Sequence, residues 1–551
     1  MTPLTLVLFF AFFQLRLLPH AGAVARHHHG GGVSLRSQQA ALLRWKSTLR
    51  GSPALESWRQ GTSPCSSNWT GVSCGVVAVR RGHRASSSSP LAVTEISLRN
   101  AGIHGRLGGE LDFSALPFLT YIDLSLNSLH GEIPPAIASL SRLSYLDLIG
   151  NFLHGHIPRE MGSMGLLGDL RLAFNNLTGR IPASLGNLTT LATLIVAHNM
   201  LAGAIPEELG KLASLDVLYL GSNLLDGHIP ESLGNLTSLR YIYLYGNHLS
   251  GPVPSSLGNL RKLRDLDLGQ NRLSSGIPVF LPNLTDLNTL YLAGNELTGF
   301  LPQEIGLLAK LNTLYLYTNQ LRGAILPAMG NLTGLNYMDL SDNQFAGSIP
   351  GEIGSLVGLR FMSLSQNQIS GPVPATFGNL TGMARLDLFS NMLSGPLPQE
   401  FAYLTHLEVL SIANNSLSGE LPPDVCKGGN LLVFQSFLTP VVTTKCDVYS
   451  FGVVVLEIVM GMYPSEIQSL ASREQHRELV MEDMLDKRPS YPTIVEEKEI
   501  ALLVEVALAC LQTSPQFRPE MEDVYQKLAL HKPSSFASPS HAPRPEEIIQ
   551  V

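Results

Sequence analysis

The sequence predicts an α/β solenoid in which repeated coils stack into one elongated domain, followed by a C-terminal helical segment. With 551 residues, the chain is too long for a single compact core. Asparagines recur every 24 residues, and each follows leucines in the L-x-L alternation of a strand with one buried face. The asparagines are Asn127, Asn151, Asn175, Asn199, Asn223, Asn247, Asn271, Asn295, Asn319, Asn343, Asn367, Asn391 and Asn415.

Around each asparagine the pattern is L-x-x-L-x-L-x-x-N-x-L-x-G-x-I-P-x-x-L-G-x-L, and Leu326 replaces the expected proline once. A single coil cannot bury its leucines, so stacked coils should share a core and a parallel sheet. The asparagine amide should bond to main-chain groups where the backbone turns. With strands ~4.8 Å apart, about fourteen coils predict a concave wall of about 65 Å. Such a surface suits a peptide or protein ligand.

The repeat resembles the plant-specific class of leucine-rich repeats over residues 92–436, which implies a right-handed superhelix with a parallel concave sheet. The stretch "QQAALLRWKSTL", with Trp58 and Trp69, resembles the N-terminal cap of plant leucine-rich-repeat receptors, so residues 26–91 are expected to form a cap and linker. Cys65 and Cys74 lie nine residues apart, and in an exported chain such a pair favours a disulfide.

Residues 1–25 predict a signal peptide, because an apolar run ends in the small-x-small pattern Ala23-Val24-Ala25. No later run reaches the ~18–20 apolar residues of a membrane helix. We therefore expect the secretory pathway and an extracellular or plasma-membrane location. The net charge of -7 is spread thinly, so no nucleic-acid partner is expected, and neither a metal site nor a cofactor is predicted.

Eight Asn-x-Ser/Thr sequons are candidate glycan acceptors in an exported chain. Glycans on the asparagine of the "GNLT" motif in alternate coils would screen the convex side. The same motif is also compatible with a consensus turn that carries no glycan. The sequons are at Asn68, Asn176, Asn187, Asn235, Asn283, Asn331, Asn379 and Asn414.

Aromatic residues occupy the strand positions that alternate with the buried leucines, where they should face the concave solvent side. Rigid amphipathic rings are common interface anchors, so they are the predicted ligand-binding residues. The alternative is the ordinary enrichment of aromatics on strands. Aspartates in the same positions could bind basic ligand groups or keep the face soluble. The predicted ligand-binding residues are Tyr219, Tyr241, Tyr243, Tyr245, Tyr291, Tyr315, Tyr317, Tyr337 and Phe361.

After about residue 437 the repeat gives way to helical patterns. "TTKCDVYSFGVVVLEIVMG" and the segment from Glu496 to Leu528 resemble the last third of the kinase domain of plant leucine-rich-repeat receptor-like Ser/Thr kinases. The resemblance implies a partial kinase C-lobe over 437–530 and a disordered tail over 531–551. It assigns Asp447 to the buried aspartate that steadies the catalytic loop, and Arg518 to the arginine that pairs with the glutamate of A-P-E.

No Gly-rich loop, V-A-I-K lysine, H-R-D-L-x-x-x-N or D-F-G precedes that segment. The chain as written should therefore bind no ATP, and no catalytic residue is predicted. The leading hypothesis is a receptor-type protein that recognises an extracellular peptide or protein, with a co-receptor kinase as a possible partner. The alternatives are a fragment of an active receptor kinase, completed by a longer transcript, and a secreted inhibitor of a wall-degrading enzyme.

Overall fold

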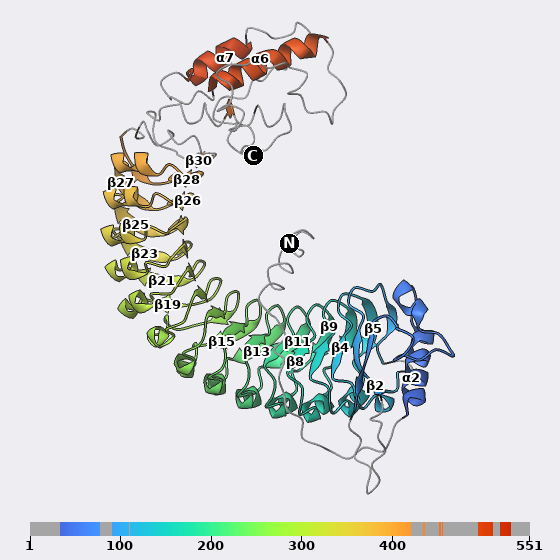
Figure 1. Cartoon of the computed structure of the whole chain (residues 1–551). Helices are drawn as coiled ribbons and strands as arrows, with labels where there is room; N and C mark the ends of the chain where they lie inside the picture. The colour runs from blue at the N-terminus through green and yellow to red at the C-terminus, as the bar shows by residue number, and fades with distance from the viewer. Residues whose placement is uncertain are drawn as a thin grey trace.

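In a computed structural model of the chain, the coils stack as an arc that runs from the N-terminal helix α2 to the strands near residue 417 (Figure 1). The structure describes residues 34–77, 91–108, 111–419, 422, 433–435, 451–452, 455, 494–510 and 518–529. The signal peptide, the predicted C-terminal tail and Asp447 lie outside these residues.

The strands of the concave side form one 16-stranded sheet in chain order. Strand β1 (Val72–Val76) pairs antiparallel with β2, and every later pair is parallel with a register of 24 or, at the start, 26 residues. The predicted parallel sheet is confirmed. Its remaining strands are β2 (Leu91–Ser97), β4 (Tyr121–Asp123), β6 (Tyr145–Asp147), β8 (Asp169–Arg171), β10 (Thr193–Ile195), β12 (Val217–Tyr219), β14 (Tyr241–Tyr243), β16 (Asp265–Asp267), β18 (Thr289–Tyr291), β20 (Thr313–Tyr315), β22 (Tyr337–Asp339), β24 (Phe361–Ser363), β26 (Arg385–Asp387), β28 (Val409–Ser411) and β30 (Val433–Gln435).

A second row of short strands lies beside the first and is split in two. Most coils carry a glycine with positive φ four residues after the repeated asparagine, but one coil carries Ser275 there with a φ of 76°. The split falls at that coil, between β17 and β19. The first part contains β3 (His104–Arg106), β5 (Ser128–Glu132), β7 (Phe152–Gly155), β9 (Asn176–Gly179), β11 (Met200–Ala204), β13 (Leu224–His228), β15 (His248–Gly251) and β17 (Arg272–Leu273); the second contains β19 (Thr298–Gly299), β21 (Gln320–Gly323), β23 (Gln344–Gly347), β25 (Gln368–Gly371), β27 (Met392–Gly395) and β29 (Ser416–Leu417).

The coils return through short 3-10 helices, most of which are capped by the repeated proline in an extended conformation. In the coil that lacks this proline, Leu326 takes the same conformation and Pro327 begins the helix, so the turn survives. The 3-10 helices are η1 (Pro53–Ser57), η2 (Phe113–Ala115), η3 (Pro135–Ser139), η4 (Arg159–Ser163), η5 (Ala183–Asn187), η6 (Glu207–Lys211), η7 (Glu231–Asn235), η8 (Ser255–Asn259), η9 (Leu281–Asn283), η10 (Gln303–Leu307), η11 (Pro327–Asn331), η12 (Gly351–Ser355), η13 (Ala375–Asn379) and η14 (Gln399–Tyr403).

The repeated asparagines form a continuous ladder between coils, as predicted. Asn223, for example, accepts the N–H of Leu201 at 3.0 Å and donates to the carbonyls of Val196 and Leu220 at 3.1 and 3.0 Å. Equivalent bonds recur from Asn127 to Asn415. The ladder satisfies peptide groups that the short strands leave unpaired, while one cluster of leucines, isoleucines and valines fills the interior of all the coils.

The N-terminal end of this core is covered by a cap. Helix α2 (Leu35–Thr48) buries Trp45, which packs near Trp58, and Trp58 stacks on Trp69 with ring centroids 5.4 Å apart. The predicted disulfide between Cys65 and Cys74 is present. The open apolar end of the first coils is therefore shielded from water.

Two C-terminal helices are described, α6 (Ile494–Cys510) and α7 (Met521–Ala529). Val506 and Cys510 on α6 pack against Val524 on α7, and Lys527 pairs with Glu505 at 2.7 Å. Arg518 is 2% exposed. The predicted helical segment is thus confirmed in these stretches, whereas the role assigned to Arg518 stays a prediction.

Candidate ligand-binding surface

The predicted tyrosines lie in register on the concave sheet. Tyr219 pairs with Tyr243, and Tyr291 pairs with Tyr315, each as the third residue of its strand. Asp267 stands between the two pairs in the same row. Because the leucine or isoleucine in the middle of each of these strands points inward, these side chains share the opposite, concave face.

The first aromatic group is more buried than the sequence suggests. Tyr219 was predicted to face solvent, but it is 4% exposed, and the ring centroids of Tyr243 and Tyr245 in the next coil lie 5.3 and 5.9 Å from its own. The prediction of a solvent-facing side chain is therefore wrong for Tyr219. Tyr337 is 39% exposed, and the other predicted aromatics are partly exposed. Their role in ligand binding stays a prediction.

Hydrogen bonds lock the first aromatic group. The Tyr219 and Tyr245 hydroxyls are 2.5 Å apart, and Tyr245 also lies 3.2 Å from Nε2 of His198, whose ring stacks on Phe174. Burial lowers the pKa of His198 and raises the pKa of Tyr219. Burial therefore favours the neutral forms of both side chains, and the hydrogen bonds and ring contacts join the group together. The sequence patterns did not single out Phe174 and His198, which come just after a strand, at the turn.

The second aromatic group is smaller and more open. Tyr291 meets Tyr315 edge to face with ring centroids 5.2 Å apart, and its hydroxyl is hydrogen-bonded to that of Tyr317. Phe361 lies further along the sheet, under the guanidinium of Arg385. A ligand on this side would meet fixed rings without first ordering them.

Carboxylates separate the two aromatic groups. Asp265 accepts a hydrogen bond from the Tyr243 hydroxyl at 2.9 Å. Asp267 accepts the Gly269 N–H at 3.0 Å, and burial, with a smaller effect from Asp265, raises the pKa of Asp267 to about 7. Elsewhere in the row, Asp123 and Asp147 are buried and bond to backbone amides two residues on, so they serve the turns and not the solvent face.

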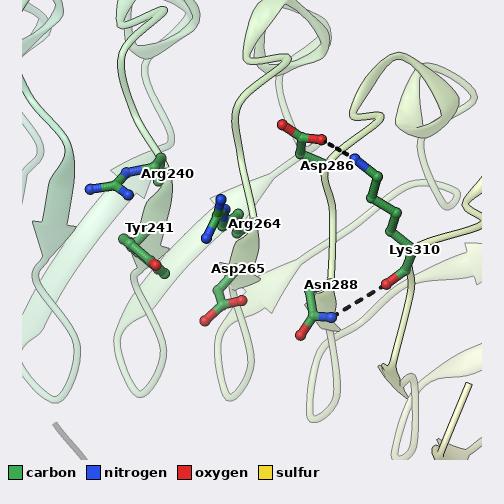
Figure 2. Close-up of a pocket in the computed structure, with 7 residues that line it drawn as sticks. All are labelled: Arg240, Tyr241, Arg264, Asp265, Asp286, Asn288 and Lys310. Atoms are coloured by element: carbon green, nitrogen blue, oxygen red, sulfur yellow. Dashed lines mark hydrogen bonds and ion pairs between the residues drawn. The ribbon is translucent and has the colours of Figure 1, made fainter. Parts of the chain in front are cut away.

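A polar pocket with a volume of about 670 Å³ opens beside the first aromatic group. Figure 2 shows Arg264 between Arg240 on one side and the Asp286–Lys310 pair on the other, with Asp265 close by. Tyr241 and Asn288 complete the lining. Sequence reasoning missed this site; the signal was two arginines 24 residues apart, both immediately before a concave strand.

All eight sequon asparagines are exposed. Asn187, Asn235, Asn283, Asn331 and Asn379 each end a 3-10 helix, on the side of the coil away from the concave sheet. Their modification stays a prediction. Among the described residues, no group of three potential metal ligands occurs, and no helix is long and apolar enough to span a membrane.

Comparison with known proteins supports this architecture. The family described as Leucine rich repeat N-terminal domain matches residues 35–75, and Leucine rich repeat families match segments from 118 to 427. The family described as Protein tyrosine and serine/threonine kinase matches residues 434–528. In these matches the chain is similar to plant leucine-rich-repeat receptor-like kinases.

Two relatives from Arabidopsis thaliana show that the sequence similarity to curated proteins is local. A probable leucine-rich repeat receptor-like protein kinase is 40% identical over 80 residues, and MDIS1-interacting receptor like kinase 2 is 42% identical over 81 residues. Each alignment covers 14% of this chain, but 7% and 8% of the two relatives.

Solved structures match the repeats far more broadly. The PEPR1–AtPEP1 structure is 32% identical, with a TM-score of 0.67 over 73% of this chain and 56% of that one. The Arabidopsis receptor kinase HAESA, solved with the peptide hormone IDA and the co-receptor SERK1, is 28% identical, with a TM-score of 0.60 over 73% of this chain and 70% of that one. The repeats of this chain are therefore built like those of the receptor ectodomains.

Proposed function

We propose that this chain is a receptor-type protein that binds an extracellular peptide along its concave tyrosine surface. The observation that carries the proposal is the pair of aromatic groups in register across β12 to β20, rigid on one side and open on the other. Hydroxyls and carboxylates between the rings offer acceptors and donors to a peptide backbone. The peptide hormone in the HAESA complex supports this class of ligand.

We infer a second partner, a co-receptor kinase, by analogy with the HAESA complex that contains SERK1. Glycans at the exposed sequons would cover the opposite side of the coils and leave the concave face and lateral edges for both partners. The match to a kinase family over 434–528 disfavours the alternative of a secreted enzyme inhibitor.

The chain as written is further proposed to transfer no phosphate. The sequence before residue 434 contains no phosphate-binding loop, paired lysine or metal-binding D-F-G of the kinase type. Incubation of the purified chain with ATP and Mg²⁺ should give no labelled product. Autophosphorylation that a point substitution in this chain abolishes would support the alternative of an active kinase.

The binding proposal is tested with Tyr291→Ala and Tyr315→Ala, singly and together. Both rings are partly exposed, whereas Tyr243 is a poor probe because it donates to Asp265 and packs over Tyr219. Each anchor should cost about 1–3 kcal/mol, or roughly tenfold to hundredfold in affinity for a peptide captured by the intact chain.

The matched control is Tyr403→Ala, because Tyr403 is 62% exposed at the end of η14, away from the concave sheet. It should leave affinity unchanged. Unaltered peptide affinity in the double variant, with an unaltered melting temperature, would refute a binding role for the tyrosine surface.

A further inference from the structure

A second groove lies among the 3-10 helices, which line the outer rim of the arc (Figure 1). Residues of three consecutive coils, from η12 to η14 and the turns that follow these helices, surround a volume of about 750 Å³. Three of them are small residues at equivalent positions, Gly354, Gly378 and Ala402. The groove therefore has room for a ligand of small-molecule size.

Two large apolar side chains line this groove and stay exposed. Val357 is 63% exposed, and Tyr403 is 62% exposed. Tyr403 is the last residue of η14, a position that Lys211 and Asn259 occupy in η6 and η8. Because grouped exposed apolar side chains mark contact sites, Val357 and Tyr403 call for an occupant.

The residues between them identify that occupant. Asn379 ends η13, with Ser355 at the same position one coil before and Tyr403 at the same position one coil after. Asn379 and Thr381 both line the groove, both are exposed, and together they form the sequon Asn-Leu-Thr. A sugar on Nδ2 of Asn379 would begin inside the groove and would keep a protein partner away from it.

The chemistry of an N-acetylglucosamine matches this lining. One face of the sugar ring carries C–H groups with a slight positive charge, and the face of an aromatic ring is negative. The acetyl methyl group is apolar and gains from contact with a valine side chain. The hydroxyls of the sugar stay in water on the open side of the groove.

We propose that the first N-acetylglucosamine of an N-glycan on Asn379 docks in this groove, with its ring on Tyr403 and its acetyl methyl group against Val357. In the attachment step, the C1–N bond to Nδ2 forms, the bond from C1 to the diphosphate of a lipid-linked donor breaks, and the released diphosphate takes the proton. The inference goes beyond the proposed peptide binding and rests on the predicted export of the chain.

Another sequon supplies an internal control. Asn235 ends η7 in the same way, but the residues at its position one coil before and one coil after are the polar Lys211 and Asn259. A glycan on Asn235 meets no aromatic ring there. The two attachment sites therefore differ in the side chains beside them and not in their place on the coil.

The first test measures access to the bond between sugar and asparagine. The full chain is expressed through a mammalian secretory pathway as the parent, Tyr403→Ala and Tyr403→Phe. Native protein is treated with peptide:N-glycosidase F, and the glycan left at Asn379 and Asn235 is followed by mass spectrometry. Denatured samples give the occupancy of both sites before cleavage.

A ring contact favours the docked arrangement by up to about tenfold, and cleavage follows the undocked fraction. We expect cleavage at Asn379 about fivefold to tenfold slower than at Asn235 in the parent and in Tyr403→Phe, which keeps the ring. In Tyr403→Ala the two sites should be cleaved at similar rates. Equal rates at Asn379 in the parent and Tyr403→Ala, or an Asn379 without glycan in the parent, would overturn the proposal.

The second test reads the same contact from the tyrosine. Nitration of Tyr403 by tetranitromethane should be about fivefold to tenfold faster in Asn379→Gln than in the glycosylated parent. Tyr525 is the matched control, because it is 64% exposed on α7, and its rate should not change. If Tyr403 were equally protected in both proteins, something other than the glycan would cover it, such as a second copy of the chain, and the proposal would fail. Neither test involves the concave tyrosine surface, so peptide affinity remains a separate readout.

Discussion

Substitution of one ladder asparagine, Asn223→Ala, should weaken the solenoid by an amount that its hydrogen bonds allow us to work out. Asn223 is 6% exposed. Its side-chain oxygen accepts the N–H of Leu201, and its amide group donates to the carbonyls of Val196 and Leu220. Alanine fits the space, but its side chain can neither accept nor donate a hydrogen bond.

The lost bonds are not equivalent. The carbonyl of Val196 also accepts Asn199, and the carbonyl of Leu220 also accepts Asn247, so both keep a partner. The N–H of Leu201 has a single hydrogen, which points at the Asn223 oxygen, and it becomes a buried donor without an acceptor. An orphaned donor costs about 1–3 kcal/mol and each lost bond about 1 kcal/mol, which gives about 3–5 kcal/mol in total.

The assay is urea unfolding of the full chain followed by far-UV circular dichroism, together with hydrogen exchange at the amide of Leu201. We expect that amide to exchange at least about a hundredfold faster in the variant. The matched control is Asn259→Ala, since Asn259 is exposed at the end of η8 and should change stability by less than about 0.5 kcal/mol. If the two variants were equally stable, the ladder would not be a source of stability, and the reasoning from buried peptide groups would fail.

Three further predictions concern other parts of the chain. Burial raises the pKa of Asp267 from 3.8 to about 7, so the folded chain keeps a proton that the unfolded chain loses, and the free energy of unfolding falls as the pH rises from about 4 to 7. Asp267→Asn should remove this fall. The melting temperature of the variant should match that of the parent near pH 4 and exceed it at pH 8, where the variant should be more stable by at most about 4 kcal/mol. Reduction of the disulfide between Cys65 and Cys74, which closes a nine-residue separation, should cost about 2.5 kcal/mol, measured by fluorescence of the cap tryptophans; no change would mean that the cap does not depend on it. Expression through a eukaryotic secretory pathway should add N-glycans that peptide:N-glycosidase F removes, with matching mass losses at the exposed sequons; unmodified peptides at all of them would leave the convex side bare.

The solenoid could be predicted from the sequence because its determinants are local and repeated. Leucine at every second strand position, an asparagine at the turn and a proline on the return path recur in each coil, so one coil's chemistry explains all of them. The cap and its disulfide were also recognisable, since Trp58, Cys65 and Cys74 stand close together in the chain. The C-terminal helices were recognisable from their helical sequence patterns.

The candidate site was only partly predictable. Strand alternation placed the tyrosines on the concave face, but it gave Tyr219 as solvent-facing, whereas Tyr243 and Tyr245 from the next coil pack against it. That error arises because exposure depends on the size of side chains one coil away, which a reading of single strands omits. The packing of His198 on Phe174 was missed for the same reason.

What the sequence determined by itself is therefore the repeat, its core and the face on which a ligand is expected. Only the tertiary structure decided which charges remain available on that face. Arg240 and Arg264 look alike in the sequence, each immediately before a concave strand. Stacking brings Asp216 onto Arg240, while the coil before Arg264 supplies another arginine, so the first guanidinium is paired and the second faces the pocket. Charges 24 residues apart become neighbours only when the coils stack, and the pairing of each group depends on the coils on both of its sides.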